Sequence, residues 1–323
     1  MFLNTLIMGT FIAISSYSWF SMWMGLEINL LSAIPLFINS NNTFSTEASM
    51  KYFISQAIAS MIIMFALMMI MIKSPLIMMS NVFYSILNSM LMLKMGAAPL
   101  HFWFPEVMEG LSWMNCVIML TWQKISPMVI IMSNKPEKSV MLIFIVSSLV
   151  ISVVYSFSQT SLRKIMTYSS INHISWMLAS MMISHSMWML YFFVYSTIAI
   201  NILLMFNYIN SNFINQLTSK NLNFMLTLNF LSMGGLPPFL GFLPKWLIIN
   251  KLSENLMFMI SFMLITSSLI MMFIYMRMFF PTMMMAIPKK KNKLFTSLKF
   301  IHITSTMILN SSLILFTLMF NLN

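Results

Sequence analysis

The stretch Leu91–Pro127, LMLKMGAAPLHFWFPEVMEGLSWMNCVIMLTWQKISP, decides how this chain must fold. It places two lysines, Lys94 and Lys124, inside apolar segments long enough to cross a bilayer, with a proline-flanked aromatic turn between them. A lysine near the middle of a bilayer costs roughly 2.5–3.5 kcal/mol on insertion scales. Because Lys245 and Glu27 also lie in apolar surroundings, we hypothesise a proton path through the membrane.

Composition sets the class of the protein. Hydrophobic residues make up 59% of the 323 residues and charged residues only 7%, whereas soluble domains carry about a quarter charged residues. The sequence therefore predicts an all-α polytopic membrane protein with a single transmembrane domain, residues 1–323. Met1–Phe20 has no basic segment and no small-residue cleavage site, so we read it as a first span rather than a signal peptide.

The charged residues and the cysteine exclude several function classes. Most of the net charge of +11 lies in loops, where positive charge sets membrane orientation. It is not accompanied by an aromatic and basic groove, so we expect no nucleic-acid partner. The single Cys116 excludes a cysteine-ligated iron–sulfur cluster or a disulfide framework within this chain.

The residue bias indicates where the chain is synthesised. It contains 42 Met and 29 Phe but only 7 Gly, and it lacks Asp. The favoured residues have A/T-rich codons, and the Met excess fits a genetic code in which an Ile codon is reassigned. Met as a flexible lipid-facing filler is the alternative, but it does not account for the frequent Asn. We therefore favour an animal mitochondrial genome.

A membrane-spanning helix needs about 20 mostly apolar residues. By this measure we expect about eleven transmembrane helices with short loops between them. Their ranges are 2–20, 22–39, 48–72, 78–97, 107–132, 139–158, 162–184, 187–209, 222–253 with an interruption, 257–280 and 299–321.

Basic residues predict the orientation of these spans. Ten loop cations, those of Lys289–Lys293 among them, fall on the side of the N-terminus, and four fall on the other side. The positive-inside rule then places the N-terminus in the matrix and the C-terminus in the intermembrane space. We expect the loop 39–45, His101 and the lysine-rich loop to share the matrix face.

Two spans carry signals of an interruption. Ser232–Trp246 reads SMGGLPPFLGFLPKW, and Pro237 and Pro238 remove two amide donors, so a continuous helix cannot pass. The fourth span shows a milder version, in which Lys94 is followed by Gly96 and Pro99. Interrupted spans in both halves of a chain are the sequence pointer to inverted-repeat transport folds.

Six stretches together resemble a known family. They are GLEIN at 25–29, STEA at 45–48 with KYF at 51–53, the segment 94–106, TWQK at 121–124, LRKI at 162–165 with YSS at 168–170, and the segment 234–246. In this order they are similar to NADH–ubiquinone oxidoreductase chain 2, the antiporter-like membrane subunits of respiratory complex I. The tail beyond Lys251 adds no motif.

The resemblance implies a fold and a division of labour. The fold would be two inverted five-helix repeats, each with a broken helix. The function would be proton translocation in the mitochondrial inner membrane, coupled to electron transfer from NADH to quinone. Flavin and iron–sulfur clusters would belong to partner subunits and no cofactor to this chain. Partners would be other membrane-arm subunits, accessory subunits and phospholipids, with cardiolipin among the candidates.

The resemblance also marks proton-relay candidates, each of which has a simpler interpretation. Glu27 would pair with Lys94, although it could be an interfacial carboxylate near the start of its helix. Lys94 could also be a helix-end lysine whose ammonium group reaches the headgroups. This alternative fits Lys124 poorly, because Lys124 lies deep within its apolar segment. Lys245 would be the broken-helix lysine, with a helix-end cation as the alternative. Relay chemistry needs lysine, since buried lysines can titrate near neutral pH and arginine does not release its proton.

The histidines are weaker candidates. His173, inside the seventh span, is either a relay group between Lys124 and the Lys245 region or a hydrogen-bonded interhelical residue. For His101 we favour an aromatic interfacial turn over a zinc ligand, because further ligands at suitable spacing are lacking. Two other functions stay open, a stand-alone cation/proton antiporter and a structural membrane-arm subunit that does not pump.

Overall fold

The structure is a computed structural model that describes residues 1–39, 42–72, 77–134, 137–219 and 223–284. These residues are almost entirely helical, and an isolated bridge between Ser161 and Phe213 is the only extended pairing among them. Six of the described helical segments are long and apolar enough to cross a membrane. The all-helical membrane fold is therefore confirmed, but the count of eleven is not. The expected helix 299–321 and the Lys289–Lys293 loop lie outside the described residues.

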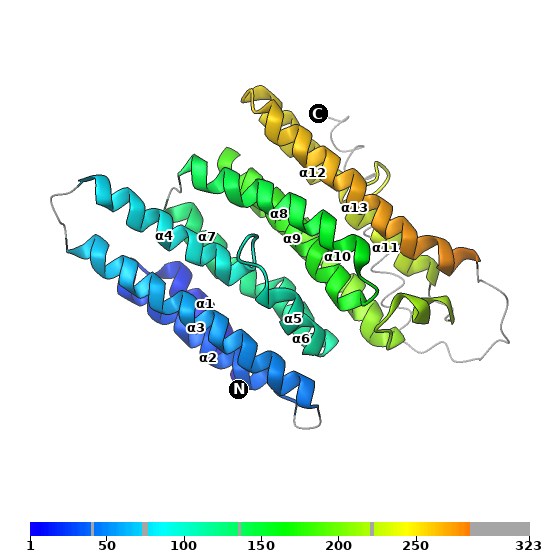
Figure 1. The fold of residues 1–323 in the computed structure, drawn as a ribbon, viewed down its shortest axis with the longest axis horizontal. Helices are drawn as coiled ribbons and strands as arrows, with labels where there is room; N and C mark the ends of the chain where they lie inside the picture. The colour runs from blue at the N-terminus through cyan, green and yellow to red at the C-terminus, as the bar shows by residue number, and fades with distance from the viewer. Residues whose placement is uncertain (40–41, 73–76, 135–136, 220–222, 285–323) are drawn as a thin grey trace, which may run out of the picture. The chain divides into compact units, whose positions relative to one another are not determined.

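The chain packs as two compact units, Met1–Ile151 and a second unit that begins at Ser152. The helices of the first unit can be followed from blue to green in Figure 1. They are α1 (Phe2–Ser15), α2 (Trp19–Phe37), α3 (Thr43–Met71), α4 (Ile77–Met95), α5 (Trp103–Gly110), α6 (Trp113–Leu120), the 3-10 turn η1 (Trp122–Lys124), α7 (Ile125–Ser133) and most of α8 (Lys138–Ser158).

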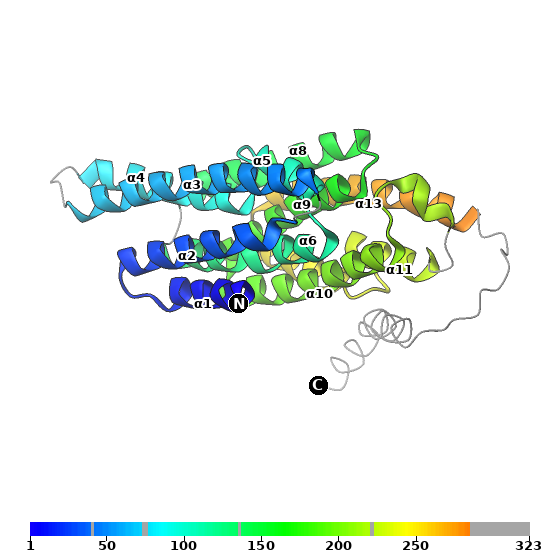
Figure 2. The same cartoon turned by 90° about the horizontal axis from the view of Figure 1, so that it is seen from below.

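Small residues allow α1 and α2 to approach closely, and the two helices lie side by side in Figure 2. A Cβ atom added at Gly25 would lie 2.8 Å from the Cα atom of Ala13. The first helix ends at Ser15 rather than near residue 20, because the Ser-Tyr-Ser turn at 16–18 separates it from α2. Ser18 caps α2 by accepting a hydrogen bond from the amide of Ser21.

The fourth span is interrupted, as expected, and α3 shows how its two parts lie. The helix α3 packs against both α4 and α5 (Figure 1). The side chain of Gln56, in the middle of α3, bonds the carbonyl of Lys94 near the end of α4, and Gly110 at the end of α5 packs against Phe44 and Ala48. The helices α4 and α5 thus follow each other antiparallel to α3. The turn 96–102 lies at mid-span, so the expectation of an interfacial turn around His101 on the matrix side is wrong.

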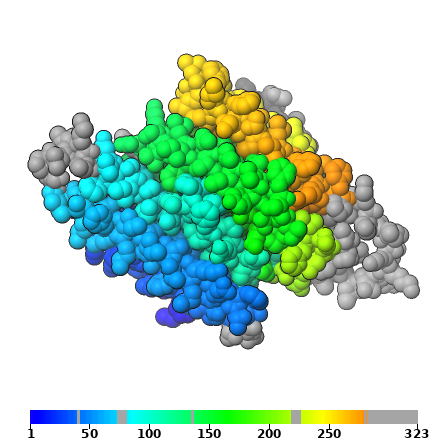
Figure 3. Space-filling model, viewed as in Figure 1, coloured from blue at the N-terminus to red at the C-terminus, as the bar shows by residue number. Residues whose placement is uncertain are grey.

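The outer face of α3 is apolar over four turns. Its exposed residues recur at helical spacing, and α3 and α4 form much of the visible face of the first unit (Figure 3). Only a third of the most apolar part of α3 is buried within the chain. Such a stripe is suited to contact with lipid rather than water. It consists of Ile54, Ile58, Met61, Phe65 and Met68.

The expected span 107–132 is not one helix. Its first residues belong to α5, and a turn at Leu111 and Ser112 separates them from α6. A second interruption, η1, carries Lys124. Pro127 explains this interruption, because it has no amide hydrogen to donate to the carbonyl of Gln123 four residues earlier. Lys124 therefore lies at a helix break, not within a regular helix as the apolar sequence predicted.

The described part of the second unit contains the end of α8 and five further helices, coloured green to orange in Figure 1. The long helix α13 packs against both α11 and α12, so the ninth expected span is interrupted between these two, as predicted. The elements are α9 (Leu162–Ile183), α10 (His185–Ile209), the 3-10 turn η2 (Ile214–Ser219), α11 (Asn223–Gly234), α12 (Phe242–Glu254) and α13 (Phe258–Met284).

The two interruptions have the same backbone. Gly96 and Gly235, 139 positions apart, both adopt left-handed φ angles, +77° and +83°, which side chains with a Cβ rarely adopt. The amides that follow bond back into the preceding helix at equivalent positions, Ala97 to Met92 and Leu236 to Leu231. The second part of each span then starts at Trp103 and Phe242, again 139 positions apart. The repeat places different charges at the breaks, because Lys94 corresponds to Met233 and Glu106 to Lys245.

Candidate functional site

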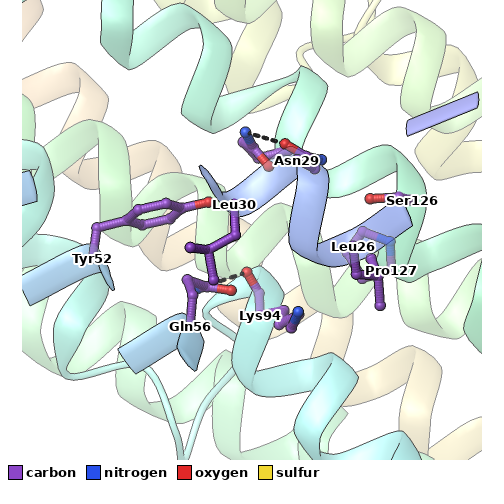
Figure 4. Close-up of a pocket in the computed structure, with 9 residues that line it drawn as sticks. Leu26, Asn29, Leu30, Tyr52, Gln56, Lys94, Ser126 and Pro127 are labelled. Carbon is purple, nitrogen blue, oxygen red and sulfur yellow. Dashed lines mark hydrogen bonds between the residues drawn. The ribbon is translucent and has the colours of Figure 1, made fainter. Parts of the chain in front are cut away.

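Lys94 lies in the last turn of α4 and lines a cavity within the first unit (Figure 4). The cavity offers about 20 Å³ to the centre of a water molecule, and roughly 10–15 Å³ is enough to hold one. Six of its nine lining residues carry polar side-chain groups, so water is a suitable occupant. These six are Asn29 on α2, Tyr52 and Gln56 on α3, Lys94, Gln123 on η1 and Ser126 on α7.

Glu27 lies on α2, a helix that lines the cavity of Lys94. A direct ion pair between the two is absent from the contacts of the described residues, and Glu27 does not line the cavity. The carboxylate therefore belongs to a helix of the cavity wall but does not contact Lys94. The closer pair expected from the sequence stays a prediction.

Lys124 is one of the most deeply buried side chains of the first unit, with 1% of its surface exposed. Its ammonium group lies 5.8 Å from the centre of the Phe104 ring, a distance that permits a cation–π interaction. Phe104 belongs to α5, directly after the mid-span turn. The break in the fourth span and the break at η1 therefore meet around this lysine, and snorkelling to a headgroup is excluded.

Lys245 closes the interruption between α11 and α12. Its ammonium group donates hydrogen bonds to the carbonyls of Gly234, at 2.8 Å, and Met233, at 3.3 Å. These are the last carbonyls of α11, which lack partners within their own helix and form the negative end of its dipole. Gly235 leaves the room, since a Cβ atom there would lie 2.9 Å from the Cδ atom of Lys245. The cation thus stabilises the end of α11, although it stands on the first turn of α12.

His173 lies on α9 and takes part in an aromatic cluster of the second unit. Its Nδ1 atom is 2.8 Å from the hydroxyl of Tyr191, and its ring centre is 4.9 Å from that of Tyr195. Trp176, one turn along α9, stacks on Tyr191 and also lies 5.7 Å from the Lys245 ammonium. His173 and Lys245 are therefore linked by a chain of two aromatic side chains, in which Tyr191 contacts His173 and Trp176 contacts Lys245. The interhelical interpretation of His173 is compatible with a relay role.

A second, smaller cavity connects His173 with the break. It offers about 10 Å³ to the centre of a water molecule, the lower limit for holding one. Its polar wall comes from α9 and α10, and its other wall comes from both sides of the interruption. The lining includes His173, Tyr191, Tyr195, Ser232, Met233 and Pro244.

Metal ligation finds no support in the described part of the chain, where groups of three or more His, Cys, Asp or Glu side chains are absent. His101 is buried and its Nδ1 atom faces the Pro99 carbonyl at 3.3 Å. The carboxylate that corresponds in the repeat to Lys245, Glu106, forms an ion pair with Lys51 on α3 at 3.0 Å. In the first unit, Glu106 therefore links α5 to α3 through its ion pair with Lys51.

Sequence reasoning missed most of the polar cavity wall. Asn29, Tyr52 and Gln123 lie inside quoted motifs, GLEIN, KYF and TWQK, but uncharged residues were given no role. Gln56 and Ser126 carry no signal beyond being polar within apolar segments. A search for amides inside predicted spans, where polar side chains are costly, would have found three of these five.

The chain matches a known family over most of its length. Residues 16–271 match the family described as NADH:quinone oxidoreductase/Mrp antiporter, transmembrane. The NADH-ubiquinone oxidoreductase chain 2 of Locusta migratoria is 40% identical over 320 residues, covering 95% of this chain and 94% of the relative. That of Anopheles gambiae is 47% identical, covering 88% and 85%.

A solved structure shares the fold. Respiratory complex I from Thermus thermophilus with bound aureothin contains a chain that superposes with a TM-score of 0.83 at 18% identity. The match covers 97% of this chain and 77% of that one. Because the two curated relatives match nearly the whole length at 40% and 47% identity, the chain belongs to the NADH-ubiquinone oxidoreductase chain 2 family.

Proposed function

We propose that this chain translocates protons as a membrane subunit of NADH:ubiquinone oxidoreductase. The observation that carries the proposal is the repeated interruption, in which each unit brings a buried or half-buried lysine to a helix break beside a small cavity. Broken backbone at membrane depth persists only where protein or a wet cavity surrounds it. Buried ionisable groups of this kind mark ion and proton paths.

Within the first unit, protons would be exchanged between the Lys94 cavity and Lys124 at η1. Glu27 would hold Lys94 in its charged form, and loss of that attraction would favour release of the proton. Within the second unit, Lys245 and His173 would form the corresponding pair. Lysine suits this task because its ammonium group can give up a proton, which a guanidinium does not do at physiological pH.

The family and the basic residues support a proposal for the membrane placement and the partners. We infer a mitochondrial inner membrane location with the N-terminus in the matrix and the C-terminus in the intermembrane space, as the basic residues indicate. Other membrane-arm subunits would be the direct partners, with accessory subunits and phospholipids, cardiolipin among them, around them. Flavin and iron–sulfur chemistry would take place in partner subunits, and the units described here would form one transmembrane domain.

Purification in mild detergent tests the assignment. The chain is expected to co-migrate with NADH-oxidising, quinone-reducing activity in one large complex. Isolation as a homodimer that exchanges sodium for protons without NADH-oxidising subunits would contradict the proposal. That result would favour a stand-alone antiporter.

A further inference from the structure

A pair of side-chain amides joins two helices at the cavity beside Lys94. The Nε2 atom of Gln123 donates a hydrogen bond of 2.9 Å to Oδ1 of Asn29. Asn29 is buried on α2, and Gln123 lies on η1, directly before Lys124. The dashed line at Asn29 in Figure 4 marks this bond. The two residues are 94 positions apart in sequence, so the bond ties the lysine-bearing turn to a distant helix.

The turn needs such an attachment. Pro127 leaves the Gln123 carbonyl without its usual helical donor, and three residues of 3-10 helix replace the regular helix at this point. Short 3-10 segments within a span often mark hinges. A side-chain bond from within that segment to α2 therefore fixes the position of η1.

The same amides form part of the wall of a cavity that has room for about one water molecule. Each side-chain amide has both donor and acceptor groups, and the bond between them uses one donor and one acceptor. The remaining groups can bind a water that also faces Lys94, Tyr52 or Gln56. The pair thus lines the cavity of Lys94 and, at the same time, holds the turn that carries Lys124.

We propose that Asn29 and Gln123 are positioning residues for proton exchange between Lys94 and Lys124, because their amide pair holds the turn η1 against the hydrated cavity that Lys94 lines. The inference rests on the proposed function. Neither amide takes up or loses a proton. They act by keeping two titratable groups and the water between them in register, a contribution that depends on distance and orientation.

The test uses the complete complex in sealed liposomes and measures protons translocated per NADH oxidised. Gln123→Met and Asn29→Leu keep similar volume but remove the bond, and each is expected to lower this ratio at least twofold while NADH oxidation continues. The double variant Asn29→Gln with Gln123→Asn exchanges the chain lengths and keeps both amides. It is expected to restore most of the ratio.

Asn115→Leu is the matched control. Asn115 on α6 donates a hydrogen bond of the same length, 2.9 Å, to the Leu36 carbonyl on α2, and it does not line the cavity. Both bonds attach the segment 113–124 to α2. If a weaker attachment of this segment to α2 were the cause of the lower ratio, Asn115→Leu would lower the ratio as much as Gln123→Met. We expect it to leave the ratio unchanged.

Lys124→Met separates failure of this inference from failure of the proposed function. If Lys124→Met lowers the ratio but Gln123→Met and Asn29→Leu do not, the positioning role is refuted and the proposed function stands. If none of the three lowers it, the proposed function fails as well. Failure of the exchanged pair to restore the ratio in assembled complex also counts against positioning. Where an apolar variant does not assemble, Asn29→Ser is measured in its place and read in the same way.

Discussion

Lys245 is the residue at which a structural role and a proton-relay role can best be distinguished by experiment, because the hydrogen bonds of its ammonium group define the structural role. It donates to the carbonyls of Gly234 and Met233 at the end of α11. Lys245→Met removes the charge and both bonds, whereas Lys245→Arg keeps a cation that can still donate but does not release its proton. A helix cap tolerates arginine, and a proton relay does not.

The size of the structural effect follows from the shorter bond, of 2.8 Å. A hydrogen bond to a charged group contributes about 1.5–3 kcal/mol. The longer bond to the Met233 carbonyl, at 3.3 Å, lies beyond the usual range of such bonds and adds little. Lys245→Met should destabilise the interruption locally by about this amount. Since 1.4 kcal/mol is tenfold in an equilibrium constant, amide exchange at the break should accelerate about 10- to 150-fold.

Two measurements on the assembled complex check this. Hydrogen–deuterium exchange at the amides of Gly235 and Leu236, which bond into α11, should rise in Lys245→Met and change little in Lys245→Arg. Protons translocated per NADH should fall in both variants. Lys251→Met is the matched control, because Lys251 lies on the same helix and forms a half-exposed ion pair with Glu254. Normal pumping by Lys245→Arg would refute the relay role and leave Lys245 as a helix cap.

Two further predictions concern α2. Glu27→Gln should reduce the protons translocated per NADH, and adding Lys94→Met should cause little further loss, because coupled residues are not additive. Fully additive losses would mean that the two serve separate steps. Gly25→Leu should lower the yield and thermal stability of the assembled complex by overpacking α2 against Ala13 on α1, a change that typically costs about 1–3 kcal/mol. Wild-type yield and stability in blue-native gels and melting curves would show that α1 and α2 can separate at no cost.

The sequence predicted the class, most helix positions and both glycine- and proline-marked interruptions. These features depend on local chemistry: apolar runs of membrane length, and the inability of Pro237 and Pro238 to donate amide hydrogens. The break at Lys124 was missed for a reason that is also local. Pro127 removes the hydrogen bond to the carbonyl four residues before it, so the helix is interrupted at Trp122–Lys124. The residues of that segment do not themselves predict a break.

The candidate site was predicted less completely, because it depends on tertiary packing. The charged members were recognised by their cost in an apolar setting. The amide pair and the cavity required knowing that α2, α3, α4 and η1 converge. His101 was misplaced because an aromatic, proline-flanked turn is also typical of a membrane interface. Only the course of α3 along both α4 and α5 identifies it as a mid-span interruption.

The central claim is that protons cross the membrane by way of the lysines of this chain. Lys124→Met tests it most directly, because the side chain is buried and methionine keeps its apolar stem while removing the titrating group. The measurement is the number of protons translocated per NADH oxidised by the assembled complex in sealed liposomes. We predict a lower ratio in the variant, with the complex intact and still oxidising NADH. An unchanged ratio would contradict the account and leave Lys124 with a purely structural role.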